Sequence, residues 1–257
     1  MRPGESGACA GPAPGRDRRG RGATGRVAFA AAGLAADRAD VNVPCMTSDE
    51  RRREGYHHGN LREALIQAAL RMIAERGLAG FAIAELARMV GVSPAAPYRH
   101  FRDRNAIIAE VARRGYARLA AELDAAWSKG RPDPIAGMQR CAQAYLDFAR
   151  ADPAAYAAMF DPGLSDAEEP GLQQASDAAL AVFRRAAEAA CERAPPGGRP
   201  PALMVALHVW SLAHGTTALF VARGDAARRK LPMSPDDLLE AGLLVYLQSL
   251  GLADAAA

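Results

Sequence analysis

The sequence predicts an all-α protein, and two observations carry that prediction. Aromatic residues make up only 6% of the 257 residues while alanine is abundant, and alanine and leucine favour helices whereas aromatic and β-branched residues favour strands. Apolar residues also recur at helical spacing from residue 61 onward, with no alternating pattern typical of strands. Half of the residues are hydrophobic, enough for the core of one or two domains.

The first 46 residues have a different composition from the rest of the chain. They are rich in Gly, Pro, Ala and Arg without a sustained period, which predicts a disordered extension for 1–46. Either Met46 is the true start of the protein, or the extension is a basic arm that adds to nucleic-acid binding. The apolar run 26–36 also invites a signal-peptide interpretation, but the run is weakly hydrophobic and lies late in the segment.

Two helices are predicted next. Asn60 with Glu63 three residues later resembles a capping box, which predicts a helix that begins there and ends before Gly77. A second helix of about two turns is predicted over 81–90, ending at Gly91.

A third, very short helix is predicted from Pro94 to His100. Ser93 is suited to the N-cap position, and Pro94 then takes the first helical position, where an N–H would have no partner. Pro97 falls at the fourth position and removes at most one hydrogen bond, at the end of the helix.

Longer helices follow. Asp103 is placed to cap a helix over 104–127, and proline- or glycine-containing breaks separate the later ones. We expect these at 134–151, 153–160, 172–193, 201–222 and 235–250. The predicted domains are a helix-turn-helix domain over 47–104 and a C-terminal helical domain over 105–257.

A two-turn helix, a glycine-containing turn and a short helix form the helix-turn-helix layout. Basic charge is concentrated on the same half of the chain. Residues 1–46 have 7 Arg against 4 acidic residues, 47–104 have 10 Arg against 7, and 105–257 have 15 basic against 18 acidic residues. This distribution favours a nucleic-acid contact at the N-terminal half.

Residues 57–110 resemble the DNA-binding domain of the TetR family of bacterial transcriptional regulators. The resemblance is carried by Ala64, Ala68, Gly77, Leu86-Ala87, Gly91-Val92-Ser93 and Tyr98-x-His100-Phe101-Arg102-x-Arg104. Trp210, His214 and Gly215 also stand where one subgroup of the family carries Trp, His and Gly on a late helix.

The resemblance implies a ligand-responsive regulator, expected to be a repressor, that binds a palindromic operator in double-stranded DNA as a homodimer. Its contacts to phosphates and base edges would come from the tip of the third helix and the residues after it: Ser93, Pro94, Ala95, Ala96, Tyr98, Arg99, His100, Arg102 and Arg104. Phe101 is expected in the core instead. Arg51 to Arg53 suit either a solvated tail or a groove contact.

One departure from the family keeps a second interpretation open. Family members usually carry Ser or Thr directly before the second helix, where it caps the helix and touches phosphate, but Ala82 stands there. The alternative is a helical module that binds a small molecule or a protein, with a degenerate DNA-binding domain.

The C-terminal domain, by the same resemblance, holds a pocket for a small apolar ligand and forms the dimer interface through its last two helices. Candidate pocket residues are apolar or aromatic with a few polar groups: Met138, Cys141, Tyr145, Phe148, Met159, Phe183, Trp210 and His214.

Several other classes of protein are disfavoured. The four cysteines form no C-x-x-C motif or disulfide framework, and no histidine pairs predict a metal site. No glycine-rich phosphate loop or G-x-S-x-G motif predicts an enzyme. We expect no cofactor, no membrane contact, since no apolar run reaches about 18 residues, and a cytoplasmic location.

Overall fold

The computed structural model describes residues 61–164, 171–195, 197–220 and 232–253, and every regular element within them is a helix. This confirms the all-α prediction. The expected extension 1–46 with its apolar run 26–36, the arginines 51–53 and the Asn60 cap lie outside these residues.

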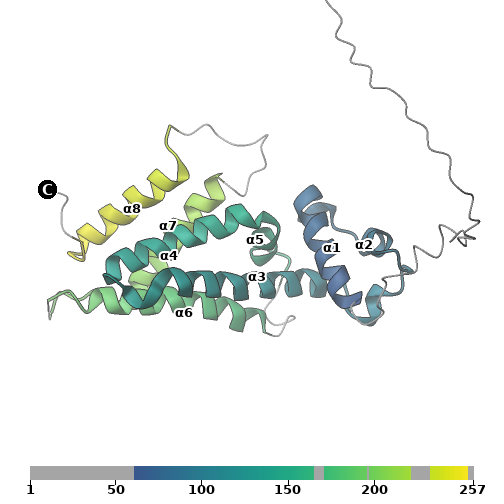
Figure 1. Cartoon of the computed structure of the whole chain (residues 1–257), viewed down its shortest axis with the longest axis horizontal. Helices are drawn as coiled ribbons and strands as arrows, with labels where there is room; N and C mark the ends of the chain where they lie inside the picture. The colour runs from purple at the N-terminus through teal and green to yellow at the C-terminus, as the bar shows by residue number, and fades with distance from the viewer. Residues whose placement is uncertain (1–60, 165–170, 196, 221–231, 254–257) are drawn as a thin grey trace, which may run out of the picture. The chain divides into compact units, whose positions relative to one another are not determined.

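Eight α-helices and three short 3-10 helices make up the described chain (Figure 1). In chain order they are α1 Leu61–Arg76, η1 Leu78–Gly80, α2 Ile83–Val90, η2 Pro97–Arg99, α3 Arg104–Trp127, η3 Ser128–Gly130, α4 Pro134–Ala151, α5 Pro153–Met159, α6 Leu172–Cys191, α7 Ala202–Phe220 and α8 Pro235–Ser249.

Most helix boundaries follow from capping residues that the sequence already shows. Asp103 accepts a hydrogen bond from the amide of Ala106 at the start of α3, and Asp133 accepts from the amides of Ile135 and Ala136 at the start of α4. Gly77 and Gly91 end α1 and α2 with positive φ angles of 69° and 76°, a conformation that favours glycine.

Helix α3 links the two predicted domains. It packs against α4, α5 and α6 along its length and against α1 near its start (Figure 1). Its apolar face is fully buried at Ile107, Ile108 and Leu123. A movement of α3 relative to α1 therefore disturbs both regions at once, because tightly packed helices shift as rigid bodies.

The far end of α3 is fixed by an aromatic side chain packed on two glycines. A Cβ atom added to Gly130 or Gly137 would lie 2.8 or 2.7 Å from the Trp127 ring, so only glycine allows η3 and α4 to approach this closely. The α3–η3–α4 corner is thereby held rigid, and α4 enters the C-terminal domain in a fixed direction.

Candidate nucleic-acid interface and ligand-binding core

The turn after α2 is built by one glycine and two apolar residues. The amide of Val92 donates to the carbonyl of Ala87 at 3.0 Å, and that of Gly91 donates to the carbonyl of Arg88 at 3.1 Å. Ala87 is fully buried and Val90 is 8% exposed, so α2 packs closely on the core. These two hydrogen bonds fix the direction in which the chain continues after Val92.

The segment after this turn differs from the α-helix predicted over Pro94 to His100. Residues 94–96 form a turn, and only Pro97–Arg99 are helical, as the 3-10 helix η2. Most of the backbone bonds are of the tighter i to i+3 kind, such as Ala96 N–H to Ser93 C=O at 3.0 Å. The prediction was wrong because Pro97 has no N–H to give Ser93 the α-helical bond.

The two prolines have different surroundings. Pro97 is buried, as is Phe101 at 5% exposed, which confirms that Phe101 belongs to the core. Pro94 lies exposed in the turn. The two prolines thus restrict the backbone of the segment, and the buried side chains of Pro97 and Phe101 attach it to the core.

Most of the predicted DNA-contact residues lie together on the exposed side of this segment. Tyr98 is 57% exposed. It is the one aromatic residue among the large hydrophobic residues that are exposed in the described chain. The other exposed members are Ser93, Pro94, Ala95, Arg99, His100 and Arg102, while Ala96 is half-buried. Their basic and hydroxyl groups are suited to phosphate, and the small apolar ones to thymine methyls.

Arg104 is the member of the predicted set that is engaged inside the protein. Its guanidinium donates to the carbonyl of Leu78 at 2.7 Å, lies 5.8 Å from the centre of the Phe81 ring and is 3.8 Å from the Asp161 carboxylate. It joins η1 to the start of α3. A phosphate contact from Arg104 stays a prediction.

The start of α2 has no side-chain cap. Ala82 takes the N-cap position with extended backbone (φ −135°, ψ 127°) and offers no hydrogen-bond acceptor. Glu85, three residues on, forms ion pairs with Arg76 at 2.6 Å and Arg88 at 3.0 Å. The doubt that the sequence raised about a cap at this helix is therefore confirmed.

A buried carboxylate that the sequence analysis did not single out joins α1 to α3. Glu110 is 8% exposed, and its Oε1 accepts hydrogen bonds from Arg62 on α1 and from Arg113 and Arg114 on α3, at 2.8–3.1 Å. Burial opposes ionisation, but hydrogen bonds from Arg113, Arg62 and Arg114 outweigh it and lower the pKa of Glu110 to about 2. Arg114 also donates to Glu63 at 2.7 Å.

The predicted pocket residues divide into two groups. Cys141, Phe148 and Met159 contact α3 or its neighbours: Cys141 Sγ lies 3.5 Å from the Leu123 carbonyl, Phe148 lies under the Arg118 guanidinium, and Met159 packs against Gly115. Met138 is also buried in the core. Burial raises the pKa of the Cys141 thiol to about 12, so it is inert at neutral pH.

The other four predicted residues lie together in an aromatic cluster. Phe183 and Trp210 stack at 6.4 Å between ring centres, and Tyr145 lies 6.4 Å from Phe183 and 6.3 Å from His214. Tyr145 and Phe183 are buried, while Trp210 and His214 are half-buried. The cluster therefore spans α4, α6 and α7.

Two aromatic residues of this cluster were missed in the sequence. Tyr156 lies within the short helix α5, which starts at Pro153, and Phe160 is the C-cap of that helix. The Phe160 ring lies 4.4 Å from the His214 ring. The spacing of four residues between Tyr156 and Phe160 on an alanine-rich segment was the available signal. Only the fold shows that α5 presents them to α7.

His214 is the polar centre of the aromatic cluster. The hydroxyl groups of Tyr145 and Tyr156 lie 2.9 and 3.0 Å from its Nδ1. In the neutral tautomer with its proton on Nε2, Nδ1 has one lone pair and accepts from one hydroxyl at a time; in the other tautomer Nδ1 donates to a tyrosine oxygen. Burial lowers the pKa of His214 and raises those of Tyr145 and Tyr156, the last to about 12, so all three are neutral near pH 7.

Two further features bear on the class of protein. Across the described residues, no group of three His, Cys, Asp or Glu side chains lies close enough to hold a metal ion. Helix α7 has the length and apolarity of a membrane-spanning segment, which the sequence analysis did not anticipate. It packs on α4, α6 and α8, and a core helix passes the same test of length and composition.

These elements define a helix-turn-helix protein with a second, helical domain. The family model for bacterial regulatory proteins of the tetR family matches residues 65–111, and a tetracyclin repressor-like C-terminal domain model matches residues 138–246. The chain belongs to the TetR family of DNA-binding transcriptional regulators. Members of this family are regulators and not enzymes.

Solved structures share the fold. A protein of unknown function from Rhodococcus sp. RHA1 is 28% identical over 76% of this chain and 98% of that chain, with a TM-score of 0.61. The TetR family regulator PfmR from Thermus thermophilus is 20% identical over 72% of this chain and 97% of that chain, with a TM-score of 0.52. A TetR-family regulator from Bordetella parapertussis is 19% identical over 77% of this chain and 100% of that chain, with a TM-score of 0.54. At these identities the two structures show the fold alone. A search of curated proteins found no match.

Proposed function

We propose that this protein is a ligand-responsive repressor that binds a palindromic operator as a homodimer in the cytoplasm. The observation that carries the proposal is the anchored, exposed segment around Tyr98, which has basic groups at Arg99, His100 and Arg102. A rigid protrusion with these groups fits a DNA groove, where phosphates position the protein and base edges give specificity. The two copies would read half-sites about one helical turn apart or slightly more.

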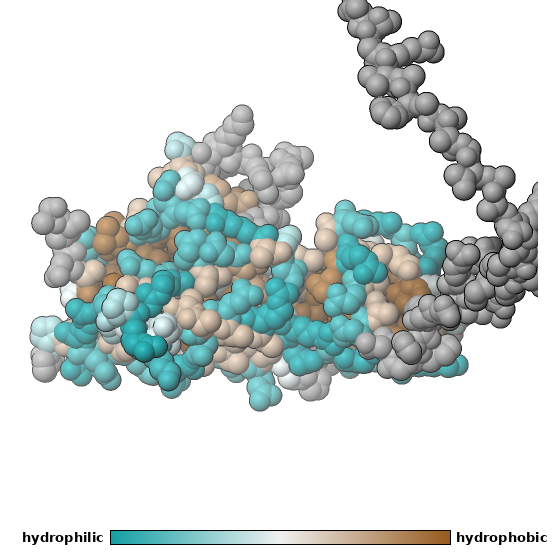
Figure 2. Space-filling view, viewed as in Figure 1, coloured by the Kyte–Doolittle hydropathy of each residue, from teal (hydrophilic) through white to brown (hydrophobic). Residues whose placement is uncertain are grey.

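Exposed apolar side chains on α7 and α8 support the homodimer. On α7, Leu203, Met204 and Leu207 are 51%, 39% and 44% exposed, and on α8 Val245 is 66% exposed. A Cβ atom added to Gly215 would meet nothing within 4 Å, so another helix can approach α7 closely there. Figure 2 shows hydrophobic residues, interspersed with hydrophilic ones, in the region of α8. Exposed apolar side chains gathered on neighbouring helices mark interaction sites.

The aromatic cluster around His214 supports a ligand-responsive core. It combines stacked rings with hydroxyl groups that share one ring nitrogen, and a ligand with its own acceptor would rearrange those hydrogen bonds. Because α5 contacts α1 as well as α3, a shift of Tyr156 reaches the DNA-binding helices. The ligand acts only to the extent that it binds one arrangement better than the other.

A helical binding module with a degenerate DNA-binding domain is the second function to test, because Ala82 leaves α2 without a cap. A gel shift with the DNA that flanks the protein's own gene separates the two functions. A repressor binds this DNA specifically and is released by its ligand. Binding no tighter than to unrelated DNA would support the second function.

A selection on random duplex DNA tests the symmetry of the operator. The homodimer proposal predicts recovered sequences with an inverted repeat, whereas a single half-site would contradict it. Repeating the selection with a panel of small hydrophobic molecules identifies compounds that release the DNA.

A further inference from the structure

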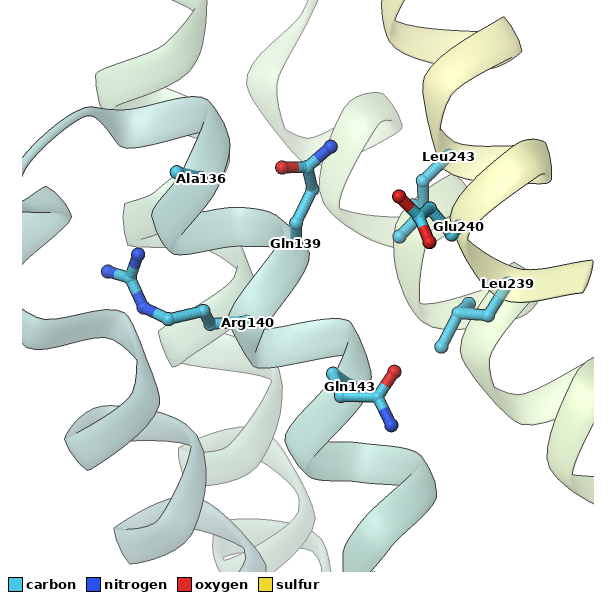
Figure 3. Close-up of a pocket in the computed structure, with 7 residues that line it drawn as sticks. All are labelled: Ala136, Gln139, Arg140, Gln143, Leu239, Glu240 and Leu243. Atoms are coloured by element: carbon cyan, nitrogen blue, oxygen red, sulfur yellow. The ribbon is translucent and has the colours of Figure 1, made fainter. Parts of the chain in front are cut away.

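The hollow between α4 and α8 offers a ligand little apolar surface. Its lining includes the Arg140 guanidinium and the Glu240 carboxylate, and its leucines, Leu239 and Leu243, are each 2% exposed (Figure 3). A polar group that lacks a partner lies elsewhere. Among the described residues, Oδ2 of Asp161, in the loop after α5, is buried and accepts no hydrogen bond.

The carboxylate of Asp161 is held in place at one oxygen only. Its Oδ1 accepts from the amide of Gly163 at 3.0 Å, and 10% of the side chain is exposed. Its Oδ2 lies 3.8 Å from Nη1 of Arg104, which is too far for a hydrogen bond. A buried carboxylate oxygen without a donor is unfavourable, so Asp161 favours an arrangement that brings the guanidinium closer.

The hydrogen bonds of the Arg104 guanidinium go to neutral oxygens. It donates to the carbonyl of Leu78 at 2.7 Å and to the side-chain oxygen of Asn105 at 3.2 Å. The Arg104 side chain is 37% exposed and comes shortly after the exposed residues His100 and Arg102. A DNA phosphate and the Asp161 carboxylate are therefore alternative anionic partners for one guanidinium.

The loop that carries Asp161 also contacts the aromatic cluster. Phe160, the residue before it, has its ring 4.4 Å from the His214 ring. Beyond Asp161, the carbonyl of Gly163 accepts from the side-chain nitrogen of Asn105 at the start of α3. Because residues 160–163 touch both regions, a shift of Phe160 changes the distance between Asp161 and the start of α3.

We propose that Asp161 is a positioning residue that competes with DNA phosphate for Arg104, and that the aromatic cluster sets how closely the two side chains approach. The inference rests on the proposed function, because it requires Arg104 to contact DNA. Closing the 3.8 Å gap gives the carboxylate its missing donor and withdraws the guanidinium from phosphate. A ligand that binds this closed arrangement better than the open one releases DNA.

Fluorescence anisotropy with the full-length protein and labelled operator tests the competition. Asp161→Asn should raise operator affinity about three- to fivefold at constant salt, the upper range for a partly exposed ion pair. It should also steepen the dependence of log affinity on log salt by up to about 0.9, the value of one phosphate contact. Its amide oxygen can still accept from Gly163. Asp161→Ser also removes the charge and keeps an acceptor, and should act in the same way.

The gain should depend on Arg104. In an Arg104→Gln background, Asp161→Asn should leave operator affinity unchanged, because the shared guanidinium is absent. Asp124→Asn is the matched control, since Asp124 is 64% exposed near the other end of α3 and pairs with Arg185, and it should leave affinity unchanged. Unchanged affinity or salt dependence in Asp161→Asn, or an equal gain in the Arg104→Gln background, would overturn the proposal.

Phe160→Leu tests the link to the aromatic cluster. Removing the ring loosens the loop and lets Asp161 approach its missing donor, so operator affinity should fall at least about twofold. The fall should be absent when Asp161→Asn is also present. A fall of equal size in both backgrounds, or no fall in either, would contradict the link.

Binding to an unrelated duplex separates this inference from the proposed function. Phosphate contacts do not depend on base sequence, so Asp161→Asn should raise this affinity as well. A wild-type protein that binds the operator no more tightly than the unrelated duplex would contradict the repressor alone. Specific operator binding that Asp161→Asn does not strengthen would contradict the competition alone.

Discussion

The guanidinium of Arg62 on α1 lies 3.1 Å from the carboxylate of Glu110 on α3. The two residues are 48 positions apart in sequence, and they join a helix of the DNA-binding region to the helix that runs through the C-terminal domain. Arg113 and Arg114 hold the same carboxylate from its own helix. The orientation of α1 on α3 therefore depends on one mostly buried ion cluster.

Glu110→Gln should destabilise the protein by about 1–3 kcal/mol in the free energy of unfolding at pH 7. The variant leaves three partly buried arginines without their carboxylate, and the figure is reduced because Arg62 and Arg113 are nearly half exposed. Urea unfolding measures it. Glu122→Gln, whose carboxylate is 45% exposed and 3.9 Å from Arg118, is the control and should change stability little.

The same carboxylate predicts a dependence on pH. The pKa of Glu110 falls from 4.5 to about 2 in the folded protein, so its stabilisation is complete above pH 4.5 and is lost as the pH falls toward 2. Wild-type protein should therefore lose more stability than Glu110→Gln over this interval. Parallel pH curves for the two proteins would contradict the assignment.

A threonine at position 82 should stabilise α2. The backbone of Ala82 already has the extended conformation of an N-cap, so the hydroxyl of Ala82→Thr can accept from a free amide of the first turn. The expected gain is about 0.5–2 kcal/mol, read as a higher melting temperature. Ala82→Val has nearly the same shape without the hydroxyl, and equal stability of the two variants would show that no cap forms.

The double variant Tyr98→Ala with Arg104→Ala should weaken operator binding at least about tenfold at constant salt. Loss of one side-chain contact to DNA costs about 1–3 kcal/mol, and about 1.4 kcal/mol corresponds to a tenfold change in affinity. Fluorescence anisotropy with labelled operator measures this. Arg104 also joins η1 to α3, so Tyr98→Ala alone, at a 57% exposed position, separates contact from folding. Unchanged affinity of the double variant would mean that the segment does not dock in the groove.

Leu207→Glu should break the homodimer. The side chain is 44% exposed in the chain taken alone, so the charge is tolerated in the monomer but opposes burial between two copies. Analytical ultracentrifugation should show a loss of dimer, and operator affinity should fall with it. Gln174→Glu on exposed α6 surface is the control. A Leu207→Glu protein that remains dimeric would place the interface elsewhere.

His214→Gln should reduce the loss of stability on mild acidification. Burial lowers the pKa of His214 from 6.5, so the unfolded chain binds a proton more readily and wild-type stability decreases as the pH falls through 6.5. Urea unfolding at pH 7.5, 6.5 and 5.5 measures the slope. His208→Gln, at an exposed position of α7, is the matched control variant. Equal slopes for both variants would show that His214 is not the titrating group.

Local signals accounted for most of the secondary structure. Asp103 caps α3 where the sequence predicted it, because a cap depends only on residues within one turn. Asp133 and Ser234 also cap helices, although the sequence analysis did not name them. The prediction failed over Pro94 to His100 for the same kind of reason. Pro97 removes the bond that distinguishes an α-helical first turn, and the chain takes i to i+3 bonds instead.

The candidate functional residues were only partly predictable. The exposed set around Tyr98 followed from a motif that is continuous in sequence. The partners of His214 come from α4 and α5, and those of Glu110 come from α1 as well as α3, so they required the helices to be placed relative to one another. No periodicity within one helix carries that information.

The sequence by itself determined the helices, their caps and the family, since these depend on spacing along the chain. Only the tertiary structure decided which charges and hydroxyl groups meet. Glu110 is held by arginines and His214 by tyrosines because the packing of α1, α3, α4, α5 and α7 brings these groups within hydrogen-bond distance. The same packing buries Glu110, Tyr145 and Tyr156, and buried polar groups need such partners.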